Sequence, residues 1–150
     1  MIQKLQHFLH TDIPLTKDMG LELVKFSHNK LQAIAPLSQN INDKGSVFGG
    51  SSSALMIISA WSLIKLNCEE YNIQADIVIH KNNTLWHKAS YEDLLINAVF
   101  SKEYDFNKIK SVIAKKRHQR IDCKIELVNK DNIKFSTMTA NYVIIPKEGA

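Results

Sequence analysis

The sequence predicts an α+β fold in which an antiparallel sheet is wrapped around one central buried helix. Three observations lead to this prediction. The apolar run ALMIISAWSLIKL, residues 54–66, places apolar side chains on almost every face of a helix, so this helix needs partners on all sides. Strand-like segments precede and follow the run. The chain of 150 residues is long enough to bury a sizeable core and suits a single domain over residues 1–150.

The elements before the buried helix follow from spacing and from turn-forming residues. Apolar side chains at helical spacing over residues 2–9 predict a short amphipathic helix that ends at residues 11–12. The pair Ile13-Pro14 then requires an extended or turn conformation. Two strand-like runs, LELVKF and LQAIAP, flank the turn-forming pair His28-Asn29 and predict a hairpin within residues 21–36.

The elements after the buried helix supply the rest of the sheet. Apolar residues at helical spacing over residues 106–113, with Asp105 as N-cap, predict one more helix. The last two strands form a hairpin across the turn at residues 129–132. The predicted strands are ADIVIH (75–80), LLINAVF (94–100), RIDCKIELV (120–128) and IKFSTMTANYVIIP (133–146).

The composition excludes several classes of protein. Hydrophobic residues make up 45% of the chain and charged residues 23%, which argues against a disordered or fibrous protein. Cys68 and Cys123 are too few for a disulfide framework, and no Cys/His cluster suggests zinc, so we predict no metal and no redox cofactor. The N-terminus lacks the features of a signal peptide and the apolar run is too short for a membrane span, which predicts a cytoplasmic protein. A net charge of +4 permits a phosphate-bearing partner.

Four segments, taken in order, carry a family resemblance. They are IPLTKDMG (13–20), NINDKGSVFGGS (40–51), Trp61 on the buried helix, and ADIVIHKNNTLWHKASYEDL (75–94). This order resembles the hotdog-fold putative thioesterase family named for the C-terminal domain of YiiD, over about residues 13–145. The family's strand usually ends in an aromatic residue, a proline and a Gly-Asp pair. Trp86 and Asp93 match that pattern, whereas Ala89 and Glu92 replace the proline and the glycine.

The glycine-rich loop also resembles a motif of hotdog thioesterases of the phenylacetyl-CoA type, Asn-x-x-Gly-x-x-His-Gly-Gly followed by an acidic residue on the helix. Asn42, Gly49 and Gly50 match the asparagine and the paired glycines. Phe48 stands in place of the histidine, and Ile57 stands in place of the acidic residue. The resemblance therefore implies a thioesterase site whose usual general base is missing.

The resemblance implies roles for the loop residues. Gly49 and Gly50 would offer unobstructed backbone N–H groups at the positive end of the helix to a developing oxyanion; alternatively, they only permit a tight turn. Asn42 would hold the attacking water or bond to the thioester carbonyl, and Asp43 is the nearest carboxylate that could replace the base. Alternatively, Asn40 or Asn42 satisfies its own backbone and Asp43 is a solvated turn residue.

Further residues are predicted to contact the substrate. Trp86 stands where the family's aromatic residue borders the acyl pocket, with packing as the alternative. His80 and His87 are rivals of Asp43 for the role of base. The serines at residues 51–53 are predicted to cap the helix. The predicted substrate-binding residues are Asn40, Phe48, Ser51, Trp86 and His87.

A second patch, AKKRHQR at residues 114–120, is basic. In folds that the chain resembles, a basic segment here meets the phosphates of coenzyme A, and the predicted phosphate-binding residues are Lys115, Lys116, Arg117 and Arg120. The alternative is a solvated basic helix end. A nucleic-acid partner is not predicted, because the patch is short and lacks interleaved aromatic residues.

These features together predict an acyl-CoA or acyl-carrier-protein thioesterase in which water attacks the thioester directly. The family resemblance implies a homodimer or a dimer of dimers, in which the loop of Asn42 and Gly49 faces Trp86 of the other chain. The first alternative is a non-catalytic acyl-CoA or lipid-binding module, because the usual histidine and helix carboxylate are absent. A hotdog dehydratase is the least favoured alternative, since it relies on those same two positions.

Overall fold

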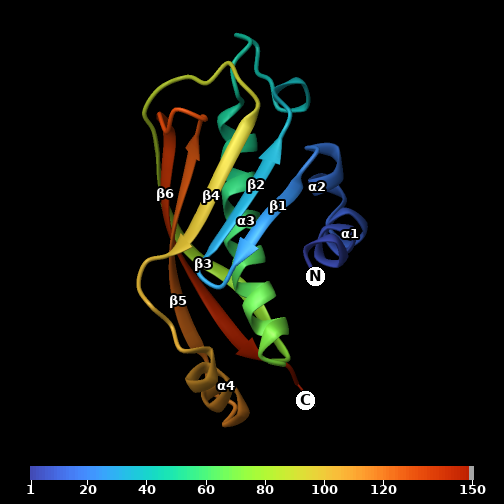
Figure 1. The fold of residues 1–150 in the computed structure, drawn as a ribbon, viewed down its shortest axis with the longest axis vertical. Coiled ribbons are helices and arrows are strands. Elements are labelled where there is room, and N and C mark those ends of the chain that lie inside the picture. The colour runs from blue at the N-terminus through green and yellow to red at the C-terminus, as the bar shows by residue number, and fades with distance from the viewer. Residues whose placement is uncertain (149–150) are drawn as a thin grey trace.

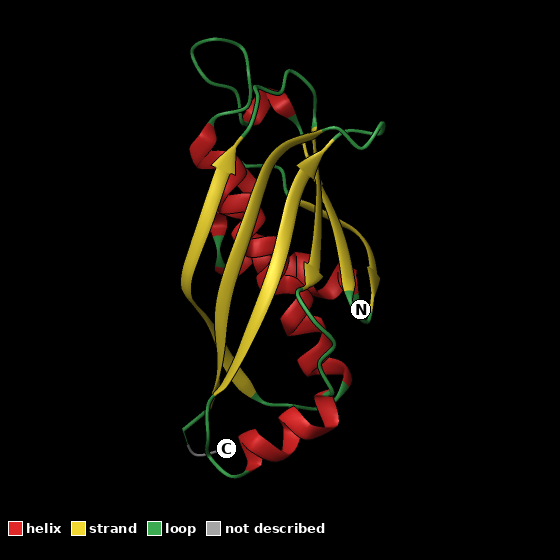
Figure 2. Cartoon of the chain, turned by 90° about the vertical axis from the view of Figure 1, so that its left-hand side faces the viewer, coloured by secondary structure: helices red, strands yellow, loops and turns green. Residues whose placement is uncertain are grey.

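The computed structural model describes residues 1–148, in which six antiparallel strands form one sheet and a long helix lies against one face of it (Figures 1 and 2). The predicted antiparallel sheet around a central helix is confirmed. The strand order is β1-β2-β4-β5-β6-β3, so β3 forms one edge of the sheet. The elements are α1 (Ile2–Asp12), α2 (Pro14–Asp18), β1 (Glu22–Ser27), β2 (Lys30–Ala35), a 3-10 turn (Leu37–Gln39), α3 (Gly49–Glu70), β3 (Ala75–Trp86), β4 (Leu94–Phe100), α4 (Phe106–Ala114), β5 (Gln119–Val128) and β6 (Lys134–Pro146).

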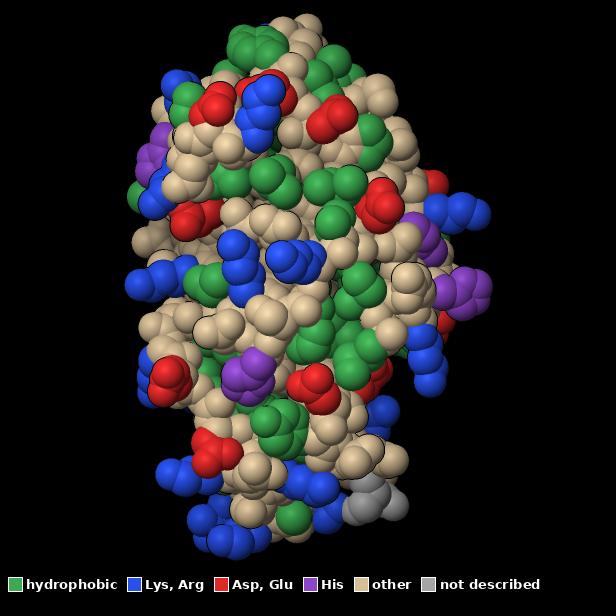
Figure 3. Space-filling view, viewed as in Figure 1, with side chains coloured by type: hydrophobic (Ala, Val, Ile, Leu, Met, Phe, Trp, Pro, Cys, Tyr) green, Lys and Arg blue, Asp and Glu red, His purple; other side chains and the backbone are tan. Residues whose placement is uncertain are grey.

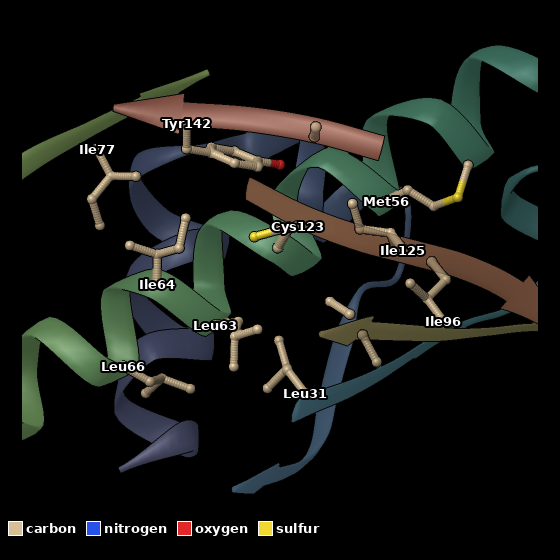
Figure 4. Close-up of a cluster of buried hydrophobic side chains, with 14 of the residues drawn as sticks. Leu31, Met56, Leu63, Ile64, Leu66, Ile77, Ile96, Cys123, Ile125 and Tyr142 are labelled. Carbon is tan, nitrogen blue, oxygen red and sulfur yellow. The ribbon is translucent and has the colours of Figure 1, made fainter. Parts of the chain in front are cut away.

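The core lies between α3 and the sheet. Side chains of α3 such as Leu63 and Ile64 are fully buried and pack with residues from most of the strands, as Figure 4 shows. The expectation that every face of this helix is enclosed is wrong for one stripe. Ala54, Ile57 and Trp61 lie on it and are only half-buried, and the Trp61 indole donates a hydrogen bond to the Ile77 carbonyl at 2.9 Å. The helix thus keeps a partly exposed apolar stripe, which reaches the edge strand β3 at Trp61.

Two element boundaries differ from the prediction. Helix α1 continues through Asp12, and Pro14 then starts the short helix α2, with only Ile13 extended between them (φ −124°, ψ 77°). Proline is compatible with the first position of a helix, where its missing N–H has no acceptor. Strand β3 continues past His80 to Trp86. Its second half is polar because it lies at the exposed edge of the sheet, so no apolar alternation marked it as a strand.

The predicted turns and the predicted N-cap of α4, Asp105, are confirmed. The Asp105 side chain accepts a hydrogen bond from the Asn107 amide at 2.9 Å at the start of α4. The turn between β5 and β6 closes with a hydrogen bond from the Asn132 amide to the Asn129 carbonyl, also at 2.9 Å. These local signals depend on neighbours in the sequence, which is why the sequence alone revealed them.

Candidate active site

The loop before α3 is fixed at its end by two backbone hydrogen bonds. The Phe48 amide donates to the Asn40 carbonyl at 2.8 Å, and the Val47 amide donates to the Ser90 carbonyl at 2.9 Å. The first bond closes the loop on itself, and the second ties it to the segment between β3 and β4. The start of α3 is therefore held in place from two sides.

Helix α3 begins with amides that have no backbone acceptor in the described residues. The first i to i−4 bond of the helix runs from the Ser52 amide to the Phe48 carbonyl at 3.0 Å, so the amides of Gly49, Gly50 and Ser51 precede it. The prediction that the serines cap the helix is wrong. They lie within the helix, and the Ser52 hydroxyl donates to the Gly49 carbonyl at 3.0 Å. Free donors and the positive end of the helix macrodipole thus coincide at Gly49 and Gly50.

The Asn42 side chain makes its hydrogen bonds within the loop itself. Its Oδ1 accepts hydrogen bonds from the Lys44 amide at 2.9 Å and the Ser46 amide at 3.1 Å, and its Nδ2 donates to Ser46 Oγ at 2.9 Å. Asp43 is exposed and pairs with the neighbouring Lys44 side chain at 3.1 Å. These contacts match the alternative in which a loop asparagine satisfies its own backbone and Asp43 is a solvated turn residue.

Asn40 is buried and ties the loop to α2. Its Nδ2 donates to the carbonyls of Met19 and Pro36, both at 2.8 Å, while its Oδ1 is buried without a hydrogen-bond partner in the described residues. Gly20 packs tightly against Pro36 in the same region. It has φ +70°, and a Cβ there would lie 2.7 Å from Pro36 Cδ, so a side chain would not fit. The segments resembling the family at residues 13–20 and 40–51 are therefore packed together around Asn40.

A cleft of about 310 Å³ lies beside the start of α3. The Trp86 indole, 56% exposed, donates a hydrogen bond to Ser52 Oγ at 3.2 Å, and its Nε1 lies 3.4 Å from where a Cβ on Gly49 would stand. A larger residue in place of Gly49 would meet this ring. The cleft is lined by Ser46, Val47, Gly49, Ser52, Trp86, Lys88, Ala89, Ser90, Leu127, Phe135 and Ser136.

Phe48 and Gly50 lie beside each other at the start of the helix. Phe48 is 55% exposed, and a Cβ on Gly50 would lie 2.5 Å from its Cε2 atom. The ring thus covers the position where a side chain at residue 50 would begin. Neither residue is among those that line the cleft.

Gly49 and Trp86 are the two predicted site residues that line the cleft together. Trp86 lies beside Gly49 of the same chain, so this contact needs no partner subunit, and a contact of the loop with Trp86 of another chain stays a prediction. His87 does not line the cleft: its Nε2 lies 2.8 Å from Thr137 Oγ1, on the face of the sheet opposite to Ser136. Ser51 is half-buried and also lies outside the lining.

The cleft is mainly apolar, with several serine hydroxyls and no acidic group in its lining. Within residues 1–148, no aspartate, glutamate or histidine lines it, and Lys88 is the one lining residue with a titratable side chain. Sequence reasoning missed Lys88, Ser90, Leu127 and Ser136. The alternation of β6 was the available signal, because it puts Ser136 on the same face as Met138, toward α3.

The basic segment lies at the other end of the molecule from the cleft (Figure 1), and lysines and arginines gather there in Figure 3. Lys115, Lys116, Arg117 and Arg120 are all exposed. Lys116 ends α4 in the left-handed region with φ 61°, and Arg120 Nη1 donates to Asn141 Oδ1 at 3.3 Å. At 1.5 Å per residue, the 22 residues of α3 separate the two ends by about 33 Å. One chain alone does not bring the basic residues to the cleft.

Other kinds of site are not evident in the described part of the chain. No group of three or more His, Cys, Asp or Glu side chains within residues 1–148 could hold a metal ion. Cys68 and Cys123 are free and buried, and burial raises the pKa of each thiol to about 12. No helix within residues 1–148 is both long and apolar enough to cross a membrane.

Comparison with known proteins shows the family of the chain. The model of the family described as "Putative thioesterase (yiiD_Cterm)" matches residues 2–146. The chain belongs to this family. No curated protein matches the chain.

Solved structures show the family's fold in this chain. A putative thioesterase from Shewanella oneidensis is 21% identical with a TM-score of 0.87, covering 97% of each chain. A protein of unknown function from Chlorobaculum tepidum is 24% identical with a TM-score of 0.88, covering 97% of this chain and 94% of its own. A thioesterase from Haemophilus influenzae is 14% identical with a TM-score of 0.79, covering 100% of this chain and 95% of its own. The chain therefore has the hotdog fold of these thioesterases.

Proposed function

We propose that the protein hydrolyses acyl thioesters of coenzyme A or of acyl carrier protein. The observation that carries this proposal is the start of α3, where Gly49, whose amide has no backbone acceptor, lines a cleft bordered by Trp86, and the equally acceptor-free amide of Gly50 follows it in the helix. The amides would hold the thioester carbonyl oxygen, and the acyl group would lie against the indole. Donors aimed at a developing oxyanion each contribute roughly 2.7–4 kcal/mol to transition-state stabilisation in enzymes of this kind of chemistry.

The reaction balances without a metal or redox cofactor. The oxygen of water forms a bond to the carbonyl carbon, the C–S bond breaks, and the leaving sulfur takes a proton to become a free thiol. The acid product then loses its proton to solvent. In this proposal Asn42 acts by holding the loop in shape, and Asp43 takes no proton, because its carboxylate lies on the exposed turn beside Lys44.

We further propose that the enzyme works as a homodimer, or as a dimer of such dimers, paired through β3. This strand is at the edge of the sheet, and the exposed apolar side chains of Val78, Ile79 and Leu85 lie along it. Antiparallel pairing of two β3 strands reverses one copy relative to the other. The basic end of each chain, residues 115–120, would then lie beside the cleft end of its partner, where it would bind the phosphates of coenzyme A.

The free cysteines support a cytoplasmic location, where thiols are kept reduced. This location agrees with coenzyme A as the carrier, and it adds no requirement to the mechanism.

A second function, binding acyl-CoA without turnover, is favoured by one observation. Within residues 1–148, no acidic or histidine side chain lines the cleft to accept a proton from water. A module of this kind would hold the thioester intact on the same amides.

Thiol release from a panel of acyl-CoAs, short to long, separates the two functions. We expect saturable release for part of the panel with purified wild-type protein. Stabilisation against heat by acyl-CoA without any thiol release would instead support the binding module. If neither signal appears, both functions are wrong for these carriers, and acyl-carrier-protein thioesters are the next substrates.

A further inference from the structure

Ser136 is a buried polar residue in an apolar row of the sheet. It pairs with Trp86 of β3 on one side and with Leu127 of β5 on the other, and Leu127 pairs in turn with Ile96 of β4. Ser136 is only 3% exposed, and it lines the cleft beside the start of α3. It is the polar member of a row whose other side chains are an indole and two aliphatic groups.

The four serines that line the cleft differ in their hydrogen bonds. Ser46 Oγ accepts from Asn42 Nδ2 at 2.9 Å, Ser52 Oγ accepts from Trp86 at 3.2 Å, and Ser90 Oγ accepts from the Glu92 amide at 3.4 Å. The hydroxyl of Ser136 has no hydrogen-bond partner anywhere in residues 1–148. Ser136 Oγ is not among the fully buried side-chain atoms that lack a partner, so this hydroxyl reaches the open space of the cleft with its hydrogen-bonding capacity unused within the described residues.

We propose that the Ser136 hydroxyl binds the water that attacks the thioester. This inference rests on the proposed hydrolysis. In the proposed reaction, the amides at the start of α3 would donate hydrogen bonds to the carbonyl oxygen. They lie on the helix side of the cleft, whereas Ser136 lies on the sheet side. The other three cleft hydroxyls each already make a hydrogen bond within the protein, so Ser136 is the cleft hydroxyl whose whole hydrogen-bonding capacity is available to orient a water between sheet and helix.

The hydroxyl positions the water and exchanges no net proton. Its oxygen accepts a hydrogen bond from the water, which points a lone pair of the water at the carbonyl carbon. The C–O bond forms as the C–S bond breaks, and the leaving sulfur takes the proton that the water loses. Ser136 ends the cycle as it began it, and no side-chain base is required.

The test compares Ser136→Ala, Ser136→Thr and a matched control, Ser62→Ala. Ser62 is buried in α3 and donates to the Ile58 carbonyl at 2.7 Å, outside the cleft. We expect Ser136→Ala to lower kcat roughly 10²-fold, as removal of one oriented hydrogen-bonding group does in other enzymes, with KM nearly unchanged. The melting temperature should stay nearly equal, since Ser136→Ala removes no hydrogen bond within the described residues. Ser136→Thr, which keeps a hydroxyl, should recover most of the lost kcat, and Ser62→Ala should keep wild-type kcat.

The possible outcomes separate this inference from the proposed function. Wild-type kcat in Ser136→Ala, with an active wild-type enzyme, overturns the role of Ser136 and leaves the thioesterase standing. A fall in melting temperature together with kcat, without recovery in Ser136→Thr, also overturns it, because the residue is then structural. If the wild type releases no thiol from any acyl-CoA or acyl-carrier-protein thioester, the proposed function and the role of Ser136 fall together.

Discussion

The two ends of α3 offer opposite kinds of chemistry. At the Gly49 end, the available groups are backbone amides and serine hydroxyls, and the loop is held in position by hydrogen bonds from the Phe48 and Val47 amides to the carbonyls of Asn40 and Ser90. At the α4 end, they are exposed cations, among them Lys115 and Arg117. The first end suits a reaction of an uncharged group, which must be placed accurately relative to these hydrogen-bonding groups. The second suits recognition of charge through solvent, which tolerates small displacements.

This difference has an energetic consequence. Losing one oriented donor at an oxyanion typically costs roughly 2.7–4 kcal/mol of transition-state stabilisation, whereas an exposed ion pair contributes about 0.2–1 kcal/mol. Substitutions at the Gly49 end should therefore change kcat strongly. Substitutions at the basic end should change the apparent affinity for charged substrates, and only modestly.

The largest effect is expected for Gly49→Val. A Cβ on Gly49 would already lie 3.4 Å from Trp86 Nε1, so the two methyl groups of valine must displace the indole or fill the cleft. We expect kcat/KM for acyl-CoA hydrolysis to fall by about 10²-fold or more, comparable with the loss of an oxyanion donor. Initial rates of thiol release across a substrate series measure this change.

The matched control for Gly49→Val is Ala54→Val, which introduces the same branched side chain five residues further along α3. Ala54 lies on the half-buried stripe, away from the cleft residues. Its variant should keep wild-type turnover. Equal losses in both variants would mean that a general change in the helix, and not crowding at the cleft, causes the effect.

The start of α3 and several turns and caps could be predicted from the sequence because their signals are local. A glycine pair before an apolar run indicates a helix start, and Asp105 or the turn at residues 129–132 is read from immediate neighbours. The predicted position of both glycines at the start of the helix agrees with the structure. The family resemblance added the order of the segments, which local patterns alone do not specify.

The rest of the site depends on contacts between distant residues. Trp86 meets Ser52 across 34 positions of sequence, and Ser136 enters the cleft only because β6 pairs with β3. No spacing rule links these residues. The contacts of Asn42 could not be predicted for a different reason. A loop asparagine can bond to its own backbone or point outward to a substrate, and both arrangements fit the same sequence.

A medium effect is expected at Asn42, where two variants distinguish the roles. Asn42→Asp keeps an oxygen to accept from the Lys44 and Ser46 amides, whereas Asn42→Ala removes both bonds. If Asn42 only shapes the loop, we expect Asn42→Asp to keep kcat within about 3-fold and Asn42→Ala to lose about 10-fold, the size of one or two net hydrogen bonds. Steady-state kinetics on one acyl-CoA measure both.

The contrary result for Asn42 would be equally informative. If Asn42→Asp is as inactive as Asn42→Ala, activity depends on the Nδ2 group, through its hydrogen bond to Ser46 Oγ or through one to the substrate, and not on the two bonds that Oδ1 accepts. Far-ultraviolet circular dichroism of both variants checks that each one keeps the fold before the rates are compared.

A smaller effect is expected at the basic end. Replacing Lys115 and Arg117 together by glutamine should raise KM for acyl-CoA about 2–10-fold with kcat unchanged, since each exposed charge contributes modestly and is screened by salt. The control is an acyl thioester of a short thiol without phosphates, for which KM should not change. A rise in KM for both substrates would mean that this end affects the cleft and not the phosphates.

No effect is expected from modifying the cysteines, which belong to neither end. Burial raises the pKa of Cys68 and of Cys123 to about 12, so at pH 8 the thiolate fraction of each is on the order of 10⁻⁴. Because only the thiolate reacts, Ellman's reagent should leave the native protein unmodified and titrate both thiols after unfolding in guanidinium. Native protein treated with iodoacetamide should keep full thiol-release activity. A thiol that reacts quickly in the native state, with loss of activity, would place a nucleophile in the reaction and contradict direct attack by water at the Gly49 end.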